Sequence, residues 1–453
     1  MPAMTFMRTI NKDILKLAVP SILANITVPL VGMVDIAVAG HLDASAAVMI
    51  GGIAIGTMLF DLLYWNFGFL RVGTGGLTAQ AYGREDHKEC ARILARALGI
   101  AFGCALLLIA VQWVFVKAAF LVVDCTPQVR ELASQYFFIR IWAAPATLGL
   151  MAFKGWFIGM QDSVSPMATD LVVNGINILM SIVLATVMGF AGIAAGTVVA
   201  QYSGLLTAVV ILLVRYRKTI LMHLDSSELK SVFKGGETRR FFVMNADLYV
   251  RSLCFIAIYI GFTVISARYG DTLLAVSSII MKLLMIFSYF TDGFAYAGEA
   301  LTGKYIGAKD GVMVRQTVKW TFIWSMGIAL IFMAIYHFAG VPMLRMMTSD
   351  QSVVAAAGGY LPWLLLMPVM GCAAFTWDGI YIGATASKAI RNSMLWAVVG
   401  FFAVWAAGLL FPDITPSASM HVLMGAYFAH LLARTVYLSA RYPRVILTSL
   451  QSS

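Results

Sequence analysis

The sequence predicts an all-α integral membrane protein with about twelve transmembrane helices, arranged as two parallel-repeat six-helix bundles. The composition is the first observation behind this fold class: of 453 residues, 60% are hydrophobic and only 12% are charged, whereas soluble domains carry about 25% charged residues. The second is a set of long apolar runs, and the third is a pair of loops that recur at one constant spacing in the chain.

The apolar runs set the positions of the expected helices. A bilayer core about 30 Å thick requires about 20 apolar residues in a helix. The first run is too long for a signal-peptide core and is not followed by a cleavage site, so we expect it to stay as a span. Runs between charged or Gly/Pro-rich breaks give the approximate spans 14–40, 45–70, 92–116, 132–153, 167–188, 191–214, 241–267, 272–297, 317–340, 353–377, 393–411 and 418–438.

The distribution of basic residues predicts the orientation of these spans. With the N-terminus in the cytoplasm, the outer loops hold little beyond Lys117, Arg130, Arg268 and Arg345, and most other Lys and Arg residues fall in inner loops. The positive-inside rule then places both termini in the cytoplasm, and the even number of spans agrees. We therefore interpret the net charge of +10 as a topology signal of a multi-pass protein of the plasma (inner) membrane, and we expect no nucleic-acid partner.

The longest hydrophilic segment lies in the middle of the chain. Residues 215–240 contain RYRK and KGGETRR and are predicted to form a cytoplasmic linker. The predicted domains are an N-terminal six-helix lobe at 1–214 and a C-terminal six-helix lobe with a short cytoplasmic tail at 241–453.

The two halves look like copies of each other. The loop YGRED at 82–86 resembles IGAKD at 306–310, and GWFIGMQDS at 155–163 resembles GIYIGATAS at 379–387. Both pairs are separated by an offset of 224 in the numbering, which we call the repeat offset. Because six spans is an even number, both copies would enter the membrane from the same side, related by an axis along the membrane normal. Around Asp35 the alignment shifts by four and pairs this aspartate with Thr263, so its carboxylate is not duplicated.

Asp35 is the main candidate for a functional residue. It is the one ionisable residue in the apolar run 17–40. A carboxylate within a spanning helix costs roughly 2.5–3.5 kcal/mol on insertion scales, so such residues usually face a polar cavity and mark an ion path. No cation lies three or four residues away, while Gly32 and Ala39 on the same helical face permit close approach of a second helix. The alternative is a carboxyl group that serves packing alone.

The fifth span offers a partner for Asp35. Its polar residues are spaced by 4, 3 and 4 positions, which places them on one face of a helix. Amides can hydrogen-bond a carboxyl group in either protonation state, so this face is predicted to line a cavity; the alternative is hydrogen bonding between helices for packing. The predicted supporting residues are Asp170, Asn174, Asn177 and Ser181, together with Thr197 of the sixth span.

The second half has ionisable residues of its own within or near its expected spans. Asp247 and Arg251 have an acid-before-base spacing that favours an ion pair on the seventh span. Lys282 lies near mid-span and requires an anion partner. Three further acidic residues lie near inner helix ends: Asp292, Glu299 and Asp378. These ionisable residues could form salt bridges at an inner gate or a second ion-binding site, and both interpretations stay open.

Several function classes lack their required residues. The five cysteines include no C-x-x-C, and the six histidines show no paired ligand spacing, so no metal site and no zinc enzyme is expected. An intramembrane protease using Asp35 and Asp170 would lack a G-x-G-D signature, and its two acids would lie at different depths. We expect no enzyme, no catalytic residues and no cofactor.

Six segments in order resemble multidrug and toxic compound extrusion (MATE) transporters, specifically their DinF-like branch. They are VPLVGMVDIAVAGHLD in the first span, YWNFGFLRVGTGGLTAQAYG at 64–83, GTVVAQY in the sixth span, NADLYVRS in the seventh, DGFAYAGEALTG at 292–303 and WDGIYIGAT in the tenth. The resemblance covers nearly the whole chain.

This resemblance implies a V-shaped pair of six-helix bundles that exports amphipathic, often cationic compounds by alternating access, driven by uptake of H⁺ or Na⁺. It maps the coupling carboxylate onto Asp35 and a bending first-helix proline onto Pro20. The family pattern N-x-x-x-D on the fifth helix matches Asn177, but Ser181 stands at the acidic position, so a sodium site with two carboxylates does not fit. We therefore expect H⁺ as the coupling ion. We also expect the protein to be a monomer in the lipid bilayer. A Na⁺-coupled exporter and a lipid-linked precursor flippase of the same superfamily are the alternatives.

The mechanism expected from these residues is a competition between substrate and proton for one lobe. Protons from outside would reach Asp35. Protonation would remove a buried charge, change the hydrogen bonds to the fifth span and so bias the two access states.

Overall fold

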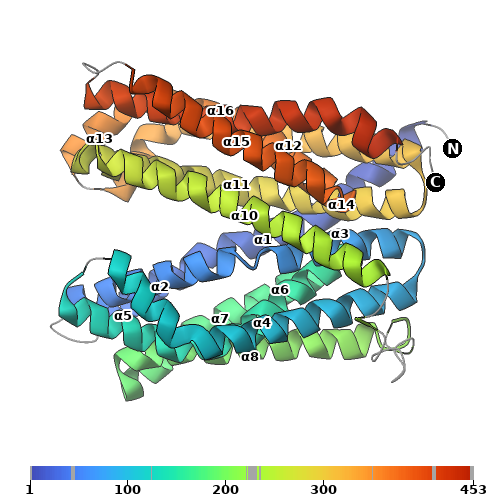
Figure 1. Cartoon of the computed structure of the whole chain (residues 1–453), viewed down its shortest axis with the longest axis horizontal. Helices are drawn as coiled ribbons and strands as arrows, with labels where there is room; N and C mark the ends of the chain where they lie inside the picture. Colours follow the sequence, from blue (N-terminus) through green and yellow to red (C-terminus); the bar gives the residue numbers. More distant parts are fainter. Residues whose placement is uncertain are drawn as a thin grey trace. The chain divides into compact units, whose positions relative to one another are not determined.

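The computed structural model describes residues 3–41, 46–123, 125–220, 222, 232–233, 236–348, 350–410 and 415–448. Within these ranges every regular element is a helix (Figure 1). The elements of the first half are α1 (Ala3–Gly40), α2 (Ala46–Trp65), α3 (Phe69–Gly83), α4 (His87–Val122), α5 (Pro127–Arg140), the 3₁₀ turn η1 (Ile141–Ala143), α6 (Ala144–Gly159), α7 (Val164–Met188) and α8 (Phe190–Arg215).

The second half follows the same order. Its elements are α10 (Gly236–Ala267), α11 (Asp271–Gly307), α12 (Gly311–Met347), the short α13 (Gln351–Gly358), α14 (Leu361–Gly383), α15 (Ser387–Gly408), α16 (Pro416–Tyr442) and η3 (Pro443–Leu447). Of the predicted linker at 215–240, residues 221, 223–231 and 234–235 lie outside the described residues.

Eleven helical stretches of the described chain are long and apolar enough to cross a membrane. Two of them combine consecutive helices: Val48–Gly83 contains α2 and α3, and Pro127–Gly159 contains α5, η1 and α6. The predicted ranges 45–70 and 132–153 were too short because tight turns at 66–68 and 141–143 join the two parts of each span. α16 has 27 residues, also enough to cross a bilayer, but polar residues such as His430 and Arg434 lower its hydropathy. The predicted all-α membrane fold is confirmed.

The chain divides into two compact units. Unit 1 comprises residues 1–22 and 243–453, and unit 2 comprises residues 23–242. α1 therefore supplies its first part to unit 1 and residues 23–40 to unit 2. Pro20, the predicted bending residue, lies within continuous helix near the end of that first part, and its missing N–H removes one helical hydrogen bond there.

Glycines at one helix crossing confirm the internal duplication. In unit 2, α6 crosses α3 so closely that a Cβ atom on Gly155 would lie 2.1 Å from the carbonyl oxygen of Arg71. In unit 1, α14 crosses α11 in the same way, with a Cβ atom on Gly379 at 2.1 Å from the carbonyl oxygen of Ala295. The two glycines are related by the repeat offset, and so are the two carbonyl residues. Only glycine fits at these crossings.

The loops after these helices are also duplicated in backbone conformation. The non-glycine residues with positive φ in the described chain are Glu85 (59°), Gln161 (63°), Lys309 (57°) and Thr385 (54°). The repeat offset relates the first to the third and the second to the fourth. Each lies at the C-terminal end of a helix. There the N–H of the following residue donates a hydrogen bond to the carbonyl oxygen five residues before that residue, as Asp86 N does to Ala81 O. This is the Schellman arrangement, whose left-handed position usually holds glycine.

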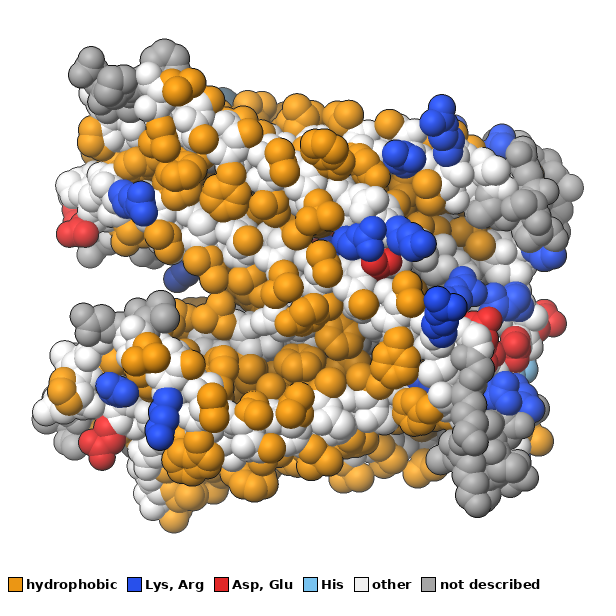
Figure 2. Space-filling view, in the orientation of Figure 1, with side chains coloured by type: hydrophobic (Ala, Val, Ile, Leu, Met, Phe, Trp, Pro, Cys, Tyr) orange, Lys and Arg blue, Asp and Glu red, His pale blue; other side chains and the backbone are white. Residues whose placement is uncertain are grey.

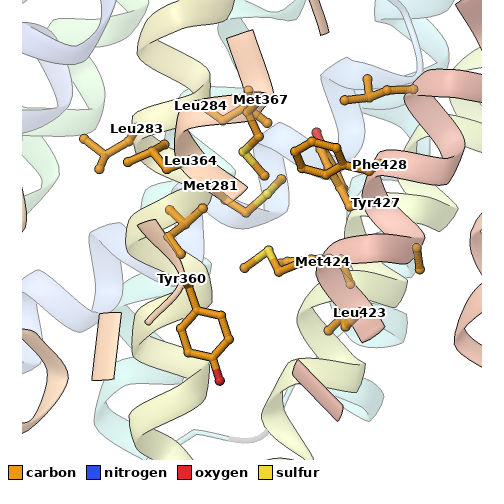
Figure 3. Close-up of a cluster of buried hydrophobic side chains, with 14 of the residues drawn as sticks. Met281, Leu283, Leu284, Tyr360, Leu364, Met367, Leu423, Met424, Tyr427 and Phe428 are labelled. Atoms are coloured by element: carbon orange, nitrogen blue, oxygen red, sulfur yellow. The ribbon is translucent and has the colours of Figure 1, made fainter. Parts of the chain in front are cut away.

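Each unit packs its helices around an apolar core. In unit 1, Met281, Met367 and Met424 lie between α11, α14 and α16 (Figure 3). In unit 2, Phe60 stacks on Phe137 at 4.7 Å between ring centroids. Many large apolar side chains point outward, including Leu107, Val114 and Val214, and hydrophobic side chains cover the middle of the face shown in Figure 2. Such an exterior suits lipid contact.

Candidate functional site

Asp35 is buried in unit 2, near the end of α1. The residue is only 5% exposed, and its Oδ1 atom has no hydrogen-bond partner in the described part of the chain. A buried carboxylate oxygen without a partner is costly, so a functional use is the natural explanation for its presence.

The neighbours of Asp35 come from α7 and α8. The Ser181 side chain interacts with Asp35, and Asn177 Nδ2 donates to Thr197 Oγ1 at 3.0 Å. Asn177 Oδ1 and Ser181 Oγ, like Asp35 Oδ1, are buried oxygens whose hydrogen-bonding capacity is not filled by the described residues. Three such oxygens therefore belong to one buried polar cluster, which we call the Asp35 cluster (Asp35, Asn177, Ser181 and Thr197).

A close helix crossing holds this cluster together. A Cβ atom on Gly196 would lie 2.6 Å from the backbone nitrogen of Ser181, and one on Gly192 would lie 2.2 Å from the carbonyl oxygen of Leu184. Glycine at both positions lets the backbones of α7 and α8 touch, which brings Asn177 within reach of Thr197.

The other two residues of the predicted stripe have different partners. Asn174 Nδ2 donates to Thr27 Oγ1 of α1 at 2.6 Å, which ties α7 to α1 two turns before Asp35. Asp170 Oδ2 accepts from Lys154 Nζ of α6 at 2.6 Å, and both side chains are 26% exposed. Asp170 lies about 16 Å along the helix from Ser181. Lys154 lies within α6, and Asp170 belongs to this ion pair and not to the Asp35 cluster.

Two further ionisable side chains accompany Asp35. Arg140, at the end of α5, interacts electrostatically with both Asp35 and Asp61 of α2. Its Nη1 atom donates to Tyr136 Oη at 3.0 Å, and its guanidinium lies 4.8 Å from the ring centroid of Phe60. Arg140 is half-buried and Asp61 is exposed. Neither was predicted, although Asp61 falls in the expected span 45–70 and Arg140 in 132–153, where the cost of a charge in a span applies as it does to Asp35.

Unit 1 contains a buried charge cluster around Asp378. Its Oδ2 atom accepts from Arg251 Nη2 of α10 and from Arg434 Nη2 of α16, each at 2.6 Å. The Arg434 side chain is 1% exposed and lies over the Phe375 ring. Because two guanidinium groups already bind this carboxylate, the arrangement favours the salt-bridge reading of Asp378 over cation binding.

The ion pair expected between Asp247 and Arg251 does not form. Asp247 instead accepts from Arg391 Nη1 at 2.6 Å and from Ser387 Oγ at 2.7 Å, both on α15. The prediction was wrong because each side chain finds a partner on a neighbouring helix, which spacing along one helix does not show.

The remaining candidates on α11 differ in exposure. Lys282 is exposed and forms no ion pair with the described carboxylates, so the predicted anion partner is absent from that part of the chain. Asp292 is half-buried, and Glu299 is fully buried.

Comparison with known proteins gives a consistent result. The family model MatE matches residues 20–183 and 248–405, which is one stretch in each half of the chain. DNA damage-inducible protein F of Escherichia coli (strain K12) is 36% identical over 400 residues, covering 88% of this chain and 86% of that protein. The probable multidrug resistance protein NorM of Photorhabdus laumondii is 23% identical, with coverage of 88% and 86%.

The solved structures agree in fold. An outward-facing multidrug resistance MATE family transporter of the MOP superfamily superposes with a TM-score of 0.85 at 15% identity, covering 100% of this chain and 99% of that one. At this identity the likeness shows the fold alone, and it matches the predicted fold class.

Proposed function

This chain belongs to the MatE family of transporters, in its DinF-like branch, and on that premise we propose that it is a proton-coupled antiporter. It exports amphipathic, often cationic small molecules by alternating access, with no enzymatic step. The observation that carries the proposal is the Asp35 cluster, in which a buried carboxylate lies with polar atoms whose hydrogen-bonding capacity the described residues do not fill.

The cluster suits a carboxyl group that gains and loses a proton. A charged carboxylate only accepts hydrogen bonds, whereas a protonated one also donates. Asn177 Nδ2 is already bound to Thr197, which leaves Asn177 Oδ1 as an acceptor without a donor among the described residues. A protonated Asp35 supplies a donor to this neighbourhood, and a charged Asp35 does not. Proton binding therefore changes the bonds between α1 and α7, and this change biases the two access states.

The ionised groups explain why a proton competes with a cationic substrate. With Asp35 charged, Asp35, Asp61 and Arg140 sum to one negative charge, which a monovalent organic cation neutralises. With Asp35 protonated, the sum is zero and the attraction is lost. For an uncharged substrate, a proton moving inward down 100 mV supplies about 2.3 kcal/mol, enough for roughly a 50-fold substrate gradient. One-for-one exchange with a monovalent cation moves no net charge, so it draws on the pH gradient alone.

Sodium coupling is the second candidate function. The same unfilled oxygens, Asn177 Oδ1 and Ser181 Oγ, are chemically suited to a hard cation as well as to a proton. The single carboxylate in the cluster weakens this candidate, because Ser181 stands where the family pattern has an acid.

The test is substrate-driven proton flux in proteoliposomes, measured with a pH-sensitive dye. Asp35→Asn should abolish coupled flux while the purified protein keeps its helical content. Asp170→Asn is the matched control, because it removes a carboxylate from the same unit about 16 Å along α7 from Ser181, and it should retain coupling. Unchanged efflux by the Asp35→Asn variant would reject the proposal.

Two further outcomes of the same assay separate the alternatives. Efflux driven by a Na⁺ gradient without a pH gradient would establish the second candidate. Flux of a lipid-linked sugar instead of drugs would point to a flippase.

We further propose that the protein is a monomer in the plasma (inner) membrane with both termini in the cytoplasm. α1 begins and α16 ends at the same end of unit 1 (Figure 1), and basic side chains gather toward that end in Figure 2. Cysteines placed near either terminus should react with a membrane-impermeant thiol reagent in inverted vesicles and not in intact cells. The reverse pattern would overturn the orientation.

A further inference from the structure

A buried stripe of hydroxyl groups runs along α12 in unit 1. Thr317, Thr321 and Ser325 are spaced four apart, so they lie on one face of the helix. All three are 0% exposed, and none of their hydroxyl oxygens has a hydrogen-bond partner among the residues described. Because a hydroxyl group in a helix can bond to a carbonyl one turn earlier, three in succession without such a bond require an explanation.

Two neighbouring helices add hydroxyl groups of the same kind. Thr302 of α11 and Thr376 of α14 are also 0% exposed and without partners in the described chain. α12 packs against both helices, and a Cβ atom on Gly298 of α11 would lie 3.3 Å from Thr321 and 3.5 Å from Ile380 of α14. The stripe therefore lies where the three helices meet. We call these five residues, Thr302, Thr317, Thr321, Ser325 and Thr376, the hydroxyl stripe.

The fold itself does not require hydroxyl groups at four of these positions. One repeat offset earlier, Thr317, Thr321, Ser325 and Thr376 correspond in unit 2 to the apolar residues Ile93, Ala97, Ala101 and Ala152, which are all at most 2% exposed. Thr302 is the exception, because its counterpart Thr78 also carries a hydroxyl group. The same packing of helices is therefore built with a mostly apolar interior in one unit and a polar interior in the other, so the run of hydroxyl groups along α12 is specific to unit 1.

We propose that the hydroxyl stripe binds a file of water molecules inside unit 1. Each hydroxyl group can donate and accept a hydrogen bond, and a buried water typically makes about three. From Thr317 to Ser325 the stripe extends about 12 Å along the helix. Oxygen ligands of one hard cation must converge to about 2.5 Å from it, which oxygens spread over this length cannot do. Several waters in a row satisfy them.

The position of the file gives unit 1 a polar path independent of Asp35. Thr317 lies in the second turn of α12 and Thr302 lies near the end of α11, so the file begins near these joined helix ends and reaches toward the middle of unit 1. Glu299, fully buried in α11, is one turn from Thr302. The file lies in the unit that does not contain the Asp35 cluster. The water-file proposal can therefore be tested independently of the proposed transport mechanism.

Infrared spectroscopy of the purified full chain tests the proposal directly. Internal water gives O–D stretching bands that shift between D₂¹⁶O and D₂¹⁸O. The triple variant Thr317→Val, Thr321→Val and Ser325→Ala should lose such bands relative to the native protein. Thr291→Val is the matched control, because Thr291 is also 0% exposed but its hydroxyl donates to Phe287 O at 3.3 Å, and it should keep them. Identical isotope-sensitive bands in the native and triple-variant proteins would overturn the proposal.

Thermal unfolding provides a second measurement that does not depend on band assignment. If Thr321 binds water, Thr321→Val removes hydrogen bonds and shifts the midpoint downward. If the stripe is dry, the same change relieves an unpaired buried hydroxyl and shifts the midpoint upward, which would contradict the proposal. Replacing choline chloride by sodium chloride should leave the midpoint unchanged. Stabilisation by sodium of the native protein but not of the triple variant would replace the water file by an ion site.

Discussion

The two units share their helix crossings and differ in where polar side chains are buried. Gly155 and Gly379 occupy equivalent crossings with the same 2.1 Å approach to a carbonyl oxygen. By contrast, the polar Asn177 and Ser181 of unit 2 correspond, one repeat offset later, to the apolar Phe401 and Trp405 of unit 1. Along α12 the hydroxyl stripe shows the reverse: polar in unit 1, apolar in unit 2. Helix crossings without room for a side chain determine the packing of both units. A few interior positions determine where each unit buries polar groups.

The largest effect is expected from the buried charge cluster of unit 1. Asp378→Asn leaves Arg251 and Arg434 without their carboxylate, which should destabilise the protein by about 3–5 kcal/mol. Arg434→Met leaves one neutral pair and should cost far less. Thermal unfolding in detergent measures both.

The half-exposed Lys154–Asp170 pair is the comparison in unit 2. Asp170→Asn should cost about 1 kcal/mol or less, because both side chains reach solvent or headgroups. Equal losses for Asp378→Asn and Asp170→Asn in the same unfolding measurement would mean that burial does not distinguish the two units' ion pairs.

The crossing glycines should respond equally in both units. Gly155→Ala and Gly379→Ala each place a methyl group against a backbone carbonyl, and each should cost about 3 kcal/mol, measured as a fall in the thermal midpoint. Gly103→Ala and Gly327→Ala are matched controls related by the repeat offset, with no atom within 4 Å of the added Cβ. They should be neutral or slightly stabilising. A strong effect in one unit only would show that the crossings are not energetically equivalent.

Equivalent helix N-caps in the two units should also contribute equally to stability, with a smaller effect than the crossing glycines. Asp86 accepts from Glu89 N at 2.9 Å, and Asp310 accepts from Met313 N at 3.0 Å. Substitution of either aspartate by alanine should cost about 1 kcal/mol and speed amide exchange in the first turn of α4 or α12. If only one of these helices becomes less protected, the two caps are not equivalent.

The smallest expected change in stability comes from acidification, which affects a helix cap made by a carboxylate but not one made by a hydroxyl group. Asp350 caps α13 by accepting from Ser352 N at 2.8 Å, whereas Thr126, its equivalent in unit 2, caps α5 with a hydroxyl group. The hydrogen bonds from Ser352 lower the pKa of Asp350 below its usual value. The stabilisation of α13 by the charged Asp350 cap is therefore complete above the unfolded-state pKa of about 3.9. It is lost as pH falls through the lower pKa of the folded state. The protection of the first-turn amides of α13, expressed relative to the intrinsic exchange rate at each pH, should fall at acidic pH, while that of α5 should not.

The sequence predicted the parts of this molecule that depend on local patterns. The apolar runs and the repeat offset were sufficient for the fold class, and the lone carboxylate in an apolar run singled out Asp35 as a candidate, which the structure finds buried. The partners of charged side chains were not predictable, because they depend on how each helix is rotated against its neighbours. Arg251 binds Asp378 of a distant helix, not Asp247 one turn away. Arg140 and Asp61 were visible in the sequence as ionisable residues within expected spans, and the rule that identified Asp35 applies to them equally.

The four left-handed residues show what the two repeated loops have in common. Glu85 and Lys309 occupy the same place in the two halves with opposite charges, as do Gln161 and Thr385 with different sizes, and none is the glycine that this conformation prefers. Four different side chains adopt the same left-handed bend at equivalent positions, so the bend serves the angle between the helices on either side and not a contact of its own side chain. The two loops are therefore more alike in backbone torsion than in sequence, and the bend itself sets the direction in which the next helix leaves.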